Sequence, residues 1–325
     1  MHIVVLTPVL DDWVAARELL SRLDAAFAPR ADEVSVLIVD DGSTQKIPAD
    51  FGAGLYKRLR EIRVVTLKKN LGHQRALAVG LCHIAEKVPC DAVVVMDSDG
   101  EDDPADAARL AGQLDASVTA ATPVSPIIFA ERTKRSESFG FRLGYQGYRL
   151  LHYVLTGRGI RFGNFSVIPR ARLAGLTIEP MLWNHYAASV VASRQPVATM
   201  PSHRGTRFAG KSHQSFVKLV IHGLSALSCY NEIIGVRLLL ISGVLLALTT
   251  SGIIVTLVLR LATHLPMAGW TSLFGGILFI FLFQVITLAS NFTMQIISLR
   301  SAQPFLPARD YAWYIDRVER CPVVS

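Results

Sequence analysis

The sequence predicts an α/β protein with a mostly parallel, doubly wound sheet, followed by two membrane-spanning helices. Three observations predict this class. Short β-branched runs alternate with helical patterns, acidic residues follow several of these runs, and two long stretches near the C-terminus carry no charge. The 325 residues allow roughly two domains of about 150 residues each. With 51% hydrophobic residues the chain is not disordered as a whole, and 4 cysteines are too few for a disulfide scaffold.

Four short runs rich in β-branched residues are predicted to be buried strands, at residues 2–6, 34–39, 62–67 and 92–96. Apolar residues recur at helical spacing over 13–27, and again over 76–85. Asp103-Pro104 begins another helix, because proline is tolerated in a first turn. Alternating strands and helices predict a parallel sheet, in which ligands bind beyond the carboxyl ends of the strands.

Polar segments follow three of these strands, at residues 7–12, 40–43 and 97–104. Because carboxyl ends of parallel strands meet at one edge, we expect the three segments to converge there. Isolated acidic turns often only cap the next helix. That alternative stands beside a site role for Asp11, Asp12, Asp41 and Ser43.

Asp97 and Asp99 are stronger candidates for a site. Two carboxylates at i and i+2 after a buried strand repel each other unless a cation offsets them. Hard oxygen ligands favour Mg²⁺ or Mn²⁺. The chain contains no GxGxxG, GxxxxGK[ST], GxSxG or HExxH pattern, which excludes the usual dinucleotide, P-loop, α/β-hydrolase and zinc-protease signatures.

Two uncharged stretches, 238–259 and 268–299, exceed the roughly 20 residues that cross a bilayer core. They predict a transmembrane hairpin at 237–299, with spans at about 238–259 and 269–297; the alternative is two buried core helices. Residues 213–236 are expected to form an amphipathic interfacial helix, or else a packed helix of the preceding domain.

The N-terminus lacks the basic region of a signal peptide, so residues 1–212 are expected to form a cytoplasmic domain. Basic residues flank the two spans and are scarce between them, which predicts cytoplasmic termini and a cytoplasmic tail at 300–325. The cysteines form no CxxC pair and are expected to be reduced. Nucleic-acid binding is not expected from the net charge of +7, because the basic residues gather beside the spans.

Three motifs in order resemble the family-2 glycosyltransferases with the GT-A fold: Asp40-Asp41-Gly42-Ser43, Asn70-Leu71-Gly72-His73 and Met96-Asp97-Ser98-Asp99. The stretch 96–104, the basic segment 207–212 and the C-terminal hairpin are similar to dolichyl-phosphate mannose synthase and bacterial polyprenyl-phosphate glycosyltransferases. The chain departs from that subfamily's pattern at Leu10-Asp11-Asp12, His73, Gly100-Glu101, Asn164 and His213-Gln214. Glu101 stands where glutamine is usual, and Asn164 where an aspartate is usual.

The resemblance implies a nucleotide-sugar donor, UDP- or GDP-linked, at the acidic rim. Asp97 and Asp99 would approach this donor as catalytic residues and as metal ligands, with Asp99 binding Mg²⁺ or Mn²⁺ directly and Glu101 joining the metal's ligands. Ser98 would lie beside them, and Pro8, Asp12 and Asp41 would line the nucleoside pocket. Arg132 would contact a donor or acceptor phosphate; the alternative is a surface ion pair with Glu131 or Glu137.

The resemblance also implies a polyprenyl phosphate acceptor, whose phosphate would meet Arg204, Arg207, Lys211 and Ser212 beside the membrane. The alternative for these residues is a patch for anionic lipids. A phosphate monoester is already ionised near neutral pH, so no general base is assigned. The expected reaction inverts the anomeric centre. The alternatives are another lipid or polysaccharide acceptor, or a non-catalytic membrane-anchored protein. A homo-oligomer packed through the hairpins is also expected.

Overall fold

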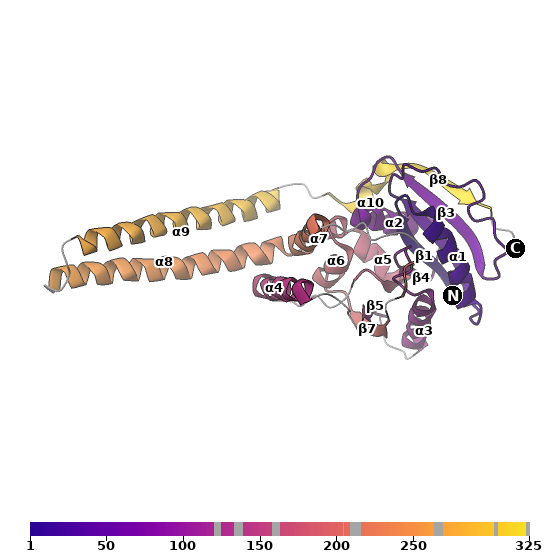
Figure 1. Ribbon diagram of the computed structural model, residues 1–325, viewed down its shortest axis with the longest axis horizontal. Helices are drawn as coiled ribbons and strands as arrows, with labels where there is room; N and C mark the ends of the chain where they lie inside the picture. Colours follow the sequence, from indigo (N-terminus) through magenta and orange to yellow (C-terminus); the bar gives the residue numbers. More distant parts are fainter. Residues whose placement is uncertain are drawn as a thin grey trace. The chain divides into compact units, whose positions relative to one another are not determined.

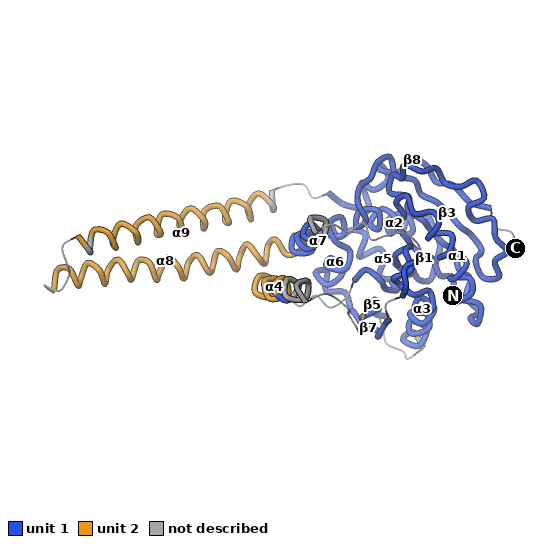
Figure 2. The backbone as a smooth tube through the Cα atoms, in the orientation of Figure 1, with its two compact units in different colours: residues 1–146, 160–229, 305–325 blue, residues 147–159, 230–304 orange. Residues whose placement is uncertain are grey.

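The computed structural model describes residues 1–119, 125–132, 139–157, 163–203, 205–208, 216–262, 269–301 and 305–322. The chain divides into two compact units (Figure 2). An α/β unit comprises residues 1–146, 160–229 and 305–325, and a helical unit comprises 147–159 and 230–304. The chain therefore leaves the α/β unit twice, first for residues 147–159 and then for the long helices, and returns to it each time.

The α/β unit is built on an eight-stranded sheet with the order β7-β5-β6-β4-β1-β2-β3-β8 (Figure 1). Strands β1 to β4 are parallel to their neighbours in this group, and β5 is parallel to β7. β6 is antiparallel to β4 and β5, and β8 is antiparallel to β3. The strands are β1 (His2–Val9), β2 (Glu33–Asp40), β3 (Leu59–Leu67), β4 (Ala92–Val95), β5 (Ile127–Arg132), β6 (Ser166–Pro169), β7 (Val197–Ser202) and β8 (Ile315–Cys321).

Two apolar layers cover this sheet. On one face, α1 (Trp13–Phe27) and α3 (Pro104–Thr119) pack through leucine and alanine side chains such as Leu19, Leu23 and Leu110. On the other face lie α2 (His73–Lys87), α5 (Arg170–Thr177), η1 (Pro180–Trp183) and α6 (Tyr186–Ala192). The central strands are buried on both faces, as near-continuous β-branched runs require. The predicted α/β class with a mostly parallel sheet is confirmed.

The segment after the long helices is part of this sheet, which the sequence did not predict. It forms α10 (Pro307–Asp310), η2 (Tyr311–Tyr314) and β8, whose residues pair with β3 from Ile62 to Leu67. The Tyr311 hydroxyl donates to Glu86 on α2 at 2.6 Å. The rings of Phe305 and Tyr314 lie 4.3 and 5.0 Å from that of Trp183. Residues 305–322 are thus the edge of the α/β unit.

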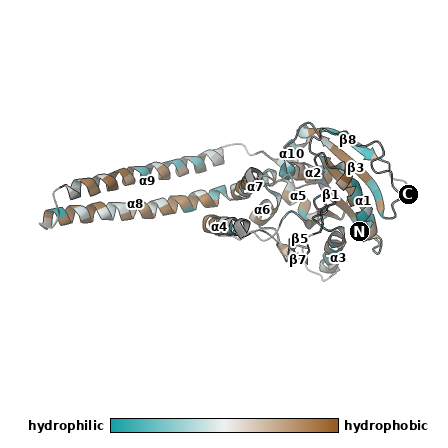
Figure 3. Cartoon of the chain, viewed as in Figure 1, coloured by the Kyte–Doolittle hydropathy of each residue, from teal (hydrophilic) through white to brown (hydrophobic). Residues whose placement is uncertain are grey.

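The helical unit contains α8 (Asn231–Ala262) and α9 (Trp270–Ser301). Both are long and apolar enough to cross a membrane, and only 11% and 6% of their most apolar windows are buried. Core helices would be mostly buried, so these two helices do not fit that alternative. Figure 3 shows apolar residues along the length of both.

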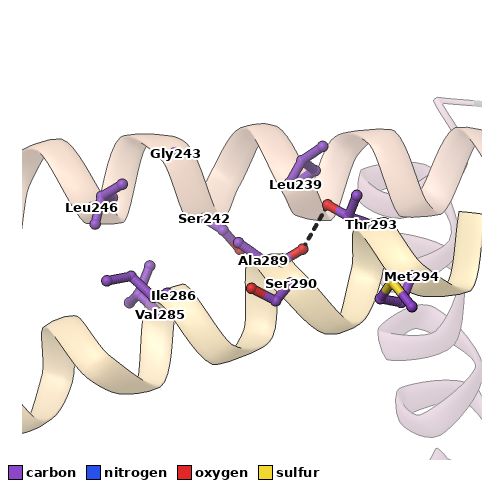
Figure 4. Close-up of a pocket in the computed structure, with 10 residues that line it drawn as sticks. All are labelled: Leu239, Ser242, Gly243, Leu246, Val285, Ile286, Ala289, Ser290, Thr293 and Met294. Atoms are coloured by element: carbon purple, nitrogen blue, oxygen red, sulfur yellow. Dashed lines mark hydrogen bonds between the residues drawn. The ribbon is translucent and has the colours of Figure 1, made fainter.

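A seam of small polar residues joins α8 to α9. Ser242, Thr249 and Thr256 recur every seven residues and are 4–5% exposed, although most of α8 is open. Their hydroxyls donate to the carbonyls of Leu238, Leu245 and Gly252, one turn back. Small residues let neighbouring helices approach closely. Thr293 of α9 makes the same kind of hydrogen bond in the pocket of Figure 4. Its hydroxyl donates to the carbonyl of Ala289, one turn back, at 2.9 Å.

Two further helices expose apolar side chains. On α4 (Phe139–Thr156), Leu150, Leu151, Tyr153 and Val154 are 50–66% exposed. Within the helical unit, Arg237 of α8 donates to the Val154 carbonyl at 2.7 Å, which ties this end of α4 to the start of the span.

The other apolar helix, α7 (Phe216–Ser228), belongs to the α/β unit. It buries Ala226 and Leu227 but exposes Val220, Ile221 and Leu224. The predicted interfacial segment 213–236 is therefore divided, because residues from Asn231 onward already belong to α8.

Candidate functional site

The turn that follows β4 is shaped by its own side chains. Asp102 accepts a hydrogen bond from the backbone of Asp97 at 3.0 Å, and Asp99 accepts one from the backbone of Glu101 at 2.9 Å. The Ser98 hydroxyl donates to the carbonyl of Pro8 at 3.3 Å, which joins the ends of β4 and β1. The acidic residues predicted at these two strand ends therefore share one edge of the sheet.

Arg207 lies directly against this turn. Its Nη2 is 2.7 Å from Asp99 Oδ2 and 3.3 Å from Glu101 Oε1, and all three side chains are 19–25% exposed. Two carboxylates held this close repel each other, and the guanidinium offsets that repulsion. The sequence placed Arg207 on the acceptor side, whereas here it contacts residues expected to hold the donor.

The chemistry of this cluster fits a divalent cation. Asp99 and Glu101 both present hard oxygen atoms to the Arg207 guanidinium, and such oxygens are the usual ligands of Mg²⁺ and Mn²⁺. Among the described residues, no three His, Cys, Asp or Glu side chains converge on one point suited to a metal. A cation bound here would therefore take some of its ligands from a nucleotide-sugar donor or from water.

A second group of side chains faces Asp97 from α2 and from the residues just before β6. His73 Nε2 is 3.3 Å from Asp97 Oδ1 and 3.0 Å from Asn164 Nδ2. Gln74 connects this group to α6, because its Nε2 donates to Asn164 Oδ1 while its Oε1 accepts from the Tyr186 backbone at 2.7 Å.

The orientation of these amides follows from the one partner that can only donate. The Tyr186 N–H requires Oε1 of Gln74, which leaves Nε2 of Gln74 to donate to Asn164 and Nδ2 of Asn164 to donate to His73. Asn164 Nδ2 therefore points toward His73 Nε2, the same nitrogen that lies 3.3 Å from Asp97 Oδ1, and burial lowers the pKa of His73. An aspartate at position 164 could not donate to this nitrogen, so the asparagine and the histidine fit as a pair.

The end of β2 holds the loop before α2. Asp41 accepts hydrogen bonds from the backbone of Leu71 at 2.7 Å and of Gly72 at 3.0 Å. Asp41 is 3% exposed, and this burial raises its pKa to about 6 despite the two hydrogen bonds. Gly42 has φ +73°, and a Cβ there would lie 2.6 Å from the Asn70 nitrogen, so glycine is required.

The end of β1 contains one turn residue and one helix boundary. Asp11 accepts from the backbone of Gln45 at 2.8 Å, and this hydrogen bond lowers its pKa. Asp11 also receives the Thr44 hydroxyl and donates its own N–H to Ser43. Asp12 stands at the N-cap of α1 without a side-chain cap bond. Asp11 and Ser43 therefore have the turn role that the sequence left open. The carboxylate of Asp12 makes no capping hydrogen bond to α1, so it can make other contacts.

The remaining predicted residues are less fully described. Arg132 is the last residue of β5. Arg204, Lys211 and Ser212 lie outside the described residues.

The sequence indicated His73 and Asn164 only as departures from a family pattern, and it did not indicate Gln74 at all. The available signal was their position in the chain. His73 and Gln74 directly follow a glycine loop, and Asn164 stands just before a strand.

A protein-family model described as glycosyl transferase family 2 matches residues 5–173 of this chain. That range contains Asp41, His73, Asp97, Asp99 and Asn164, and it ends before Arg207.

The chain is also similar to undecaprenyl-phosphate 4-deoxy-4-formamido-L-arabinose transferases. It is 26% identical over 287 residues to that of Sodalis glossinidius (strain morsitans), covering 86% of this chain and 83% of that protein. It is 26% identical over 250 residues to that of Erwinia tasmaniensis, covering 75% and 72%. Among solved structures, glucosyl-3-phosphoglycerate synthase from Mycobacterium tuberculosis with Mn²⁺, UDP-glucose and phosphoglyceric acid matches with TM-score 0.46 and 14% identity, over 72% of this chain and 80% of that one.

Proposed function

Because the chain belongs to glycosyl transferase family 2, we propose that it transfers a sugar from a nucleotide-sugar donor to a polyprenyl phosphate at a membrane surface. One observation carries this proposal. The acidic turn Asp97–Glu101 faces Arg207 of the basic segment, in a chain whose two long apolar helices could cross a membrane. The similarity to undecaprenyl-phosphate sugar transferases over most of the chain supports the same class of acceptor.

On the donor side, we assign Asp97, Asp99 and Glu101 to the nucleotide diphosphate and its divalent cation. Mg²⁺ or Mn²⁺, when bound by Asp99 and Glu101, supplies positive charge that stabilises the departing nucleotide. Ser98 keeps the turn against Pro8. Asp41 supports the site through the loop at Leu71 and Gly72 that it holds. Pro8 and Asp12 would line the nucleoside pocket.

On the acceptor side, we assign Arg204, Arg207, Lys211 and Ser212 to the lipid phosphate, and Arg132 to a donor or acceptor phosphate. Arginine forks bind phosphate through paired hydrogen bonds. The acceptor phosphate is already an anion, so the residues must neutralise and aim it more than deprotonate it. His73, within hydrogen-bond distance of Asn164, lies beside Asp97 and would meet the sugar or diphosphate.

We further propose that the helical unit anchors the enzyme in the membrane, with both chain ends in the cytoplasm. The exposed apolar faces of α4 and α7 would lie in the lipid headgroup region. For α4 this follows from its hydrogen bond to Arg237, since that residue stands where the uncharged part of α8 begins.

The transfer reaction is tested with membranes that contain the full chain, a panel of labelled UDP- and GDP-sugars, polyprenyl phosphate and Mg²⁺ or Mn²⁺. We expect a butanol-soluble, acid-labile labelled product from the native chain. Asp99→Ala should lower its formation by at least about 100-fold, because the charge on the leaving nucleotide loses its stabilisation.

The matched control is Asp316→Ala, since Asp316 is about half exposed on β8 and should leave turnover unchanged. Turnover by Asp99→Ala equal to that of the control would contradict the donor-site assignment. A labelled water-soluble polymer in place of the lipid product would instead identify a polysaccharide acceptor.

A further inference from the structure

Arg207 is held at the acidic turn by more than its charge. The backbone N–H of Gly205 donates to the Glu101 carbonyl at 2.9 Å, and that of Phe208 donates to the Asp99 carbonyl at 2.8 Å. The segment 205–208 thus runs along the turn with a hydrogen bond on each side of Arg207. The ion pair to Asp99 and Glu101 therefore belongs to a docked segment.

Close packing supports this docking. A Cβ at Gly205 would lie 2.2 Å from the Gly100 carbonyl oxygen, and a Cβ at Gly100 would lie 2.6 Å from the Phe208 ring. Glycine at 205 therefore lets the two backbones approach, and glycine at 100, where φ is +88°, leaves room for the Phe208 ring. The Arg22 guanidinium lies over the Phe208 ring, 4.5 Å from its centroid.

The guanidinium and a divalent cation need the same oxygen atoms. Arg207 Nη2 contacts Oδ2 of Asp99 and Oε1 of Glu101, and an arginine keeps its charge at any working pH. Placing a second cation among these atoms would bring like charges within contact distance, which is unfavourable in a half-buried site.

We propose that Arg207 is an internal counter-ion that occupies Asp99 and Glu101 until a divalent cation replaces it, and that this exchange releases segment 205–208. The inference rests on the proposed function, because it takes the cation to be the one that accompanies the donor. Release moves Arg207 from the donor side toward the acceptor phosphate, so that acceptor binding follows donor binding. Glu101 is essential to this arrangement because a neutral glutamine would hold the guanidinium less firmly.

The test measures Mn²⁺ binding to the purified full chain in detergent, without donor or acceptor, by the electron paramagnetic resonance signal of free Mn²⁺. Arg207→Gln should lower the Kd for Mn²⁺ about tenfold, because the competing cation is gone. Arg17→Gln removes the same charge from an exposed ion pair with Asp50 and should change the Kd less than twofold. An Arg207→Gln variant that binds Mn²⁺ no more tightly than the native chain would overturn the proposal.

Hydrogen exchange supplies the second measurement. In the native chain, Mn²⁺ should speed exchange of the Gly205 and Phe208 amides, which donate to the turn. Glu101→Gln should speed it without Mn²⁺. Slower exchange on addition of Mn²⁺ would overturn the proposal.

The two proposals fail in different ways. Sugar transfer that continues in a chain with no Mn²⁺ or Mg²⁺ binding would overturn the counter-ion role and leave the transferase proposal in place. Arg207-dependent Mn²⁺ binding without transfer to any lipid phosphate would support the counter-ion role and contradict the proposed acceptor.

Discussion

At the scale of single residues, position in the fold changes what an acidic side chain does. Asp11 is only partly buried and receives backbone hydrogen bonds, which lower its pKa, whereas Asp41 is buried and its pKa rises to about 6. Both follow strands in the sequence and looked alike there. Burial separates them, because the cost of desolvating a carboxylate depends on neighbours that come from distant parts of the chain.

The raised pKa of Asp41 predicts a pH dependence of stability. The folded pKa of about 6 exceeds the unfolded value near 3.9, so the folded state holds its proton more tightly. This contribution favours folding below about pH 4 and is lost as the pH rises through 6, by about 3 kcal/mol.

We therefore expect the stability advantage of the native chain over Asp41→Asn to shrink as the pH rises from 4 to 7, measured by chemical unfolding of both proteins in detergent. Asp316→Asn, at an exposed position, is the control and should give a difference that is constant with pH. A native advantage that grows over this range would contradict the assignment.

At the scale of elements, the strands and helices of the first 119 residues and the two long apolar helices agree with their sequence patterns, while the elements after α9 do not follow from theirs. The predicted strand at residues 62–67 is β3, and the helix at 13–27 is α1. The strand β8 has five exposed residues of seven and no clear alternation. It is a strand because β3 offers a free edge, and an edge is a property of the assembled sheet.

The return of the C-terminal segment to the α/β unit depends on an aromatic cluster. Trp183→Ala would remove the ring that contacts Phe305 and Tyr314, and should lower the free energy of unfolding by about 3 kcal/mol. Limited proteolysis should then cut within residues 305–322 sooner than in the native chain. Trp313 is 75% exposed in the same segment, so Trp313→Ala should leave both measurements near native values. Equal proteolysis of the two variants would show that the cluster does not hold the segment.

At the scale of the whole molecule, a chain with net charge +7 and 51% hydrophobic residues divides into the α/β unit and the helical unit, which contains the two long apolar helices. Each long helix of 32 residues is about 48 Å long, more than the ~30 Å hydrocarbon core requires. Their ends, including Arg237, can therefore lie among headgroups. Two membrane crossings would also place the two flanking segments on one side. A homo-oligomer formed through the hairpins stays a prediction.

The membrane arrangement is tested by cysteine labelling in bacterial spheroplasts, in a variant whose native cysteines are alanine. A membrane-impermeant maleimide should label Leu261→Cys from outside, since Leu261 stands at the end of α8 and is 79% exposed. Trp313→Cys should be labelled only after permeabilisation. Val154→Cys, on the apolar face of α4, should stay unlabelled until detergent removes the lipid.

The reverse pattern for the Leu261 and Trp313 positions would contradict the proposed topology. Labelling of Val154→Cys in permeabilised membranes without detergent would contradict the membrane contact of α4.

The sequence by itself determined the α/β class, the apolar hairpin and the acidic turn at Asp97–Glu101, because these depend on local periodicity and on residue type at strand ends. Tertiary structure alone decided that β8 completes the sheet, that Gln74 orients Asn164 and His73, and that Arg207 faces Asp99. Each of these contacts joins residues at least 90 positions apart in the sequence. Such contacts depend on how elements pack and which hydrogen-bond partners remain available, and no local pattern records either.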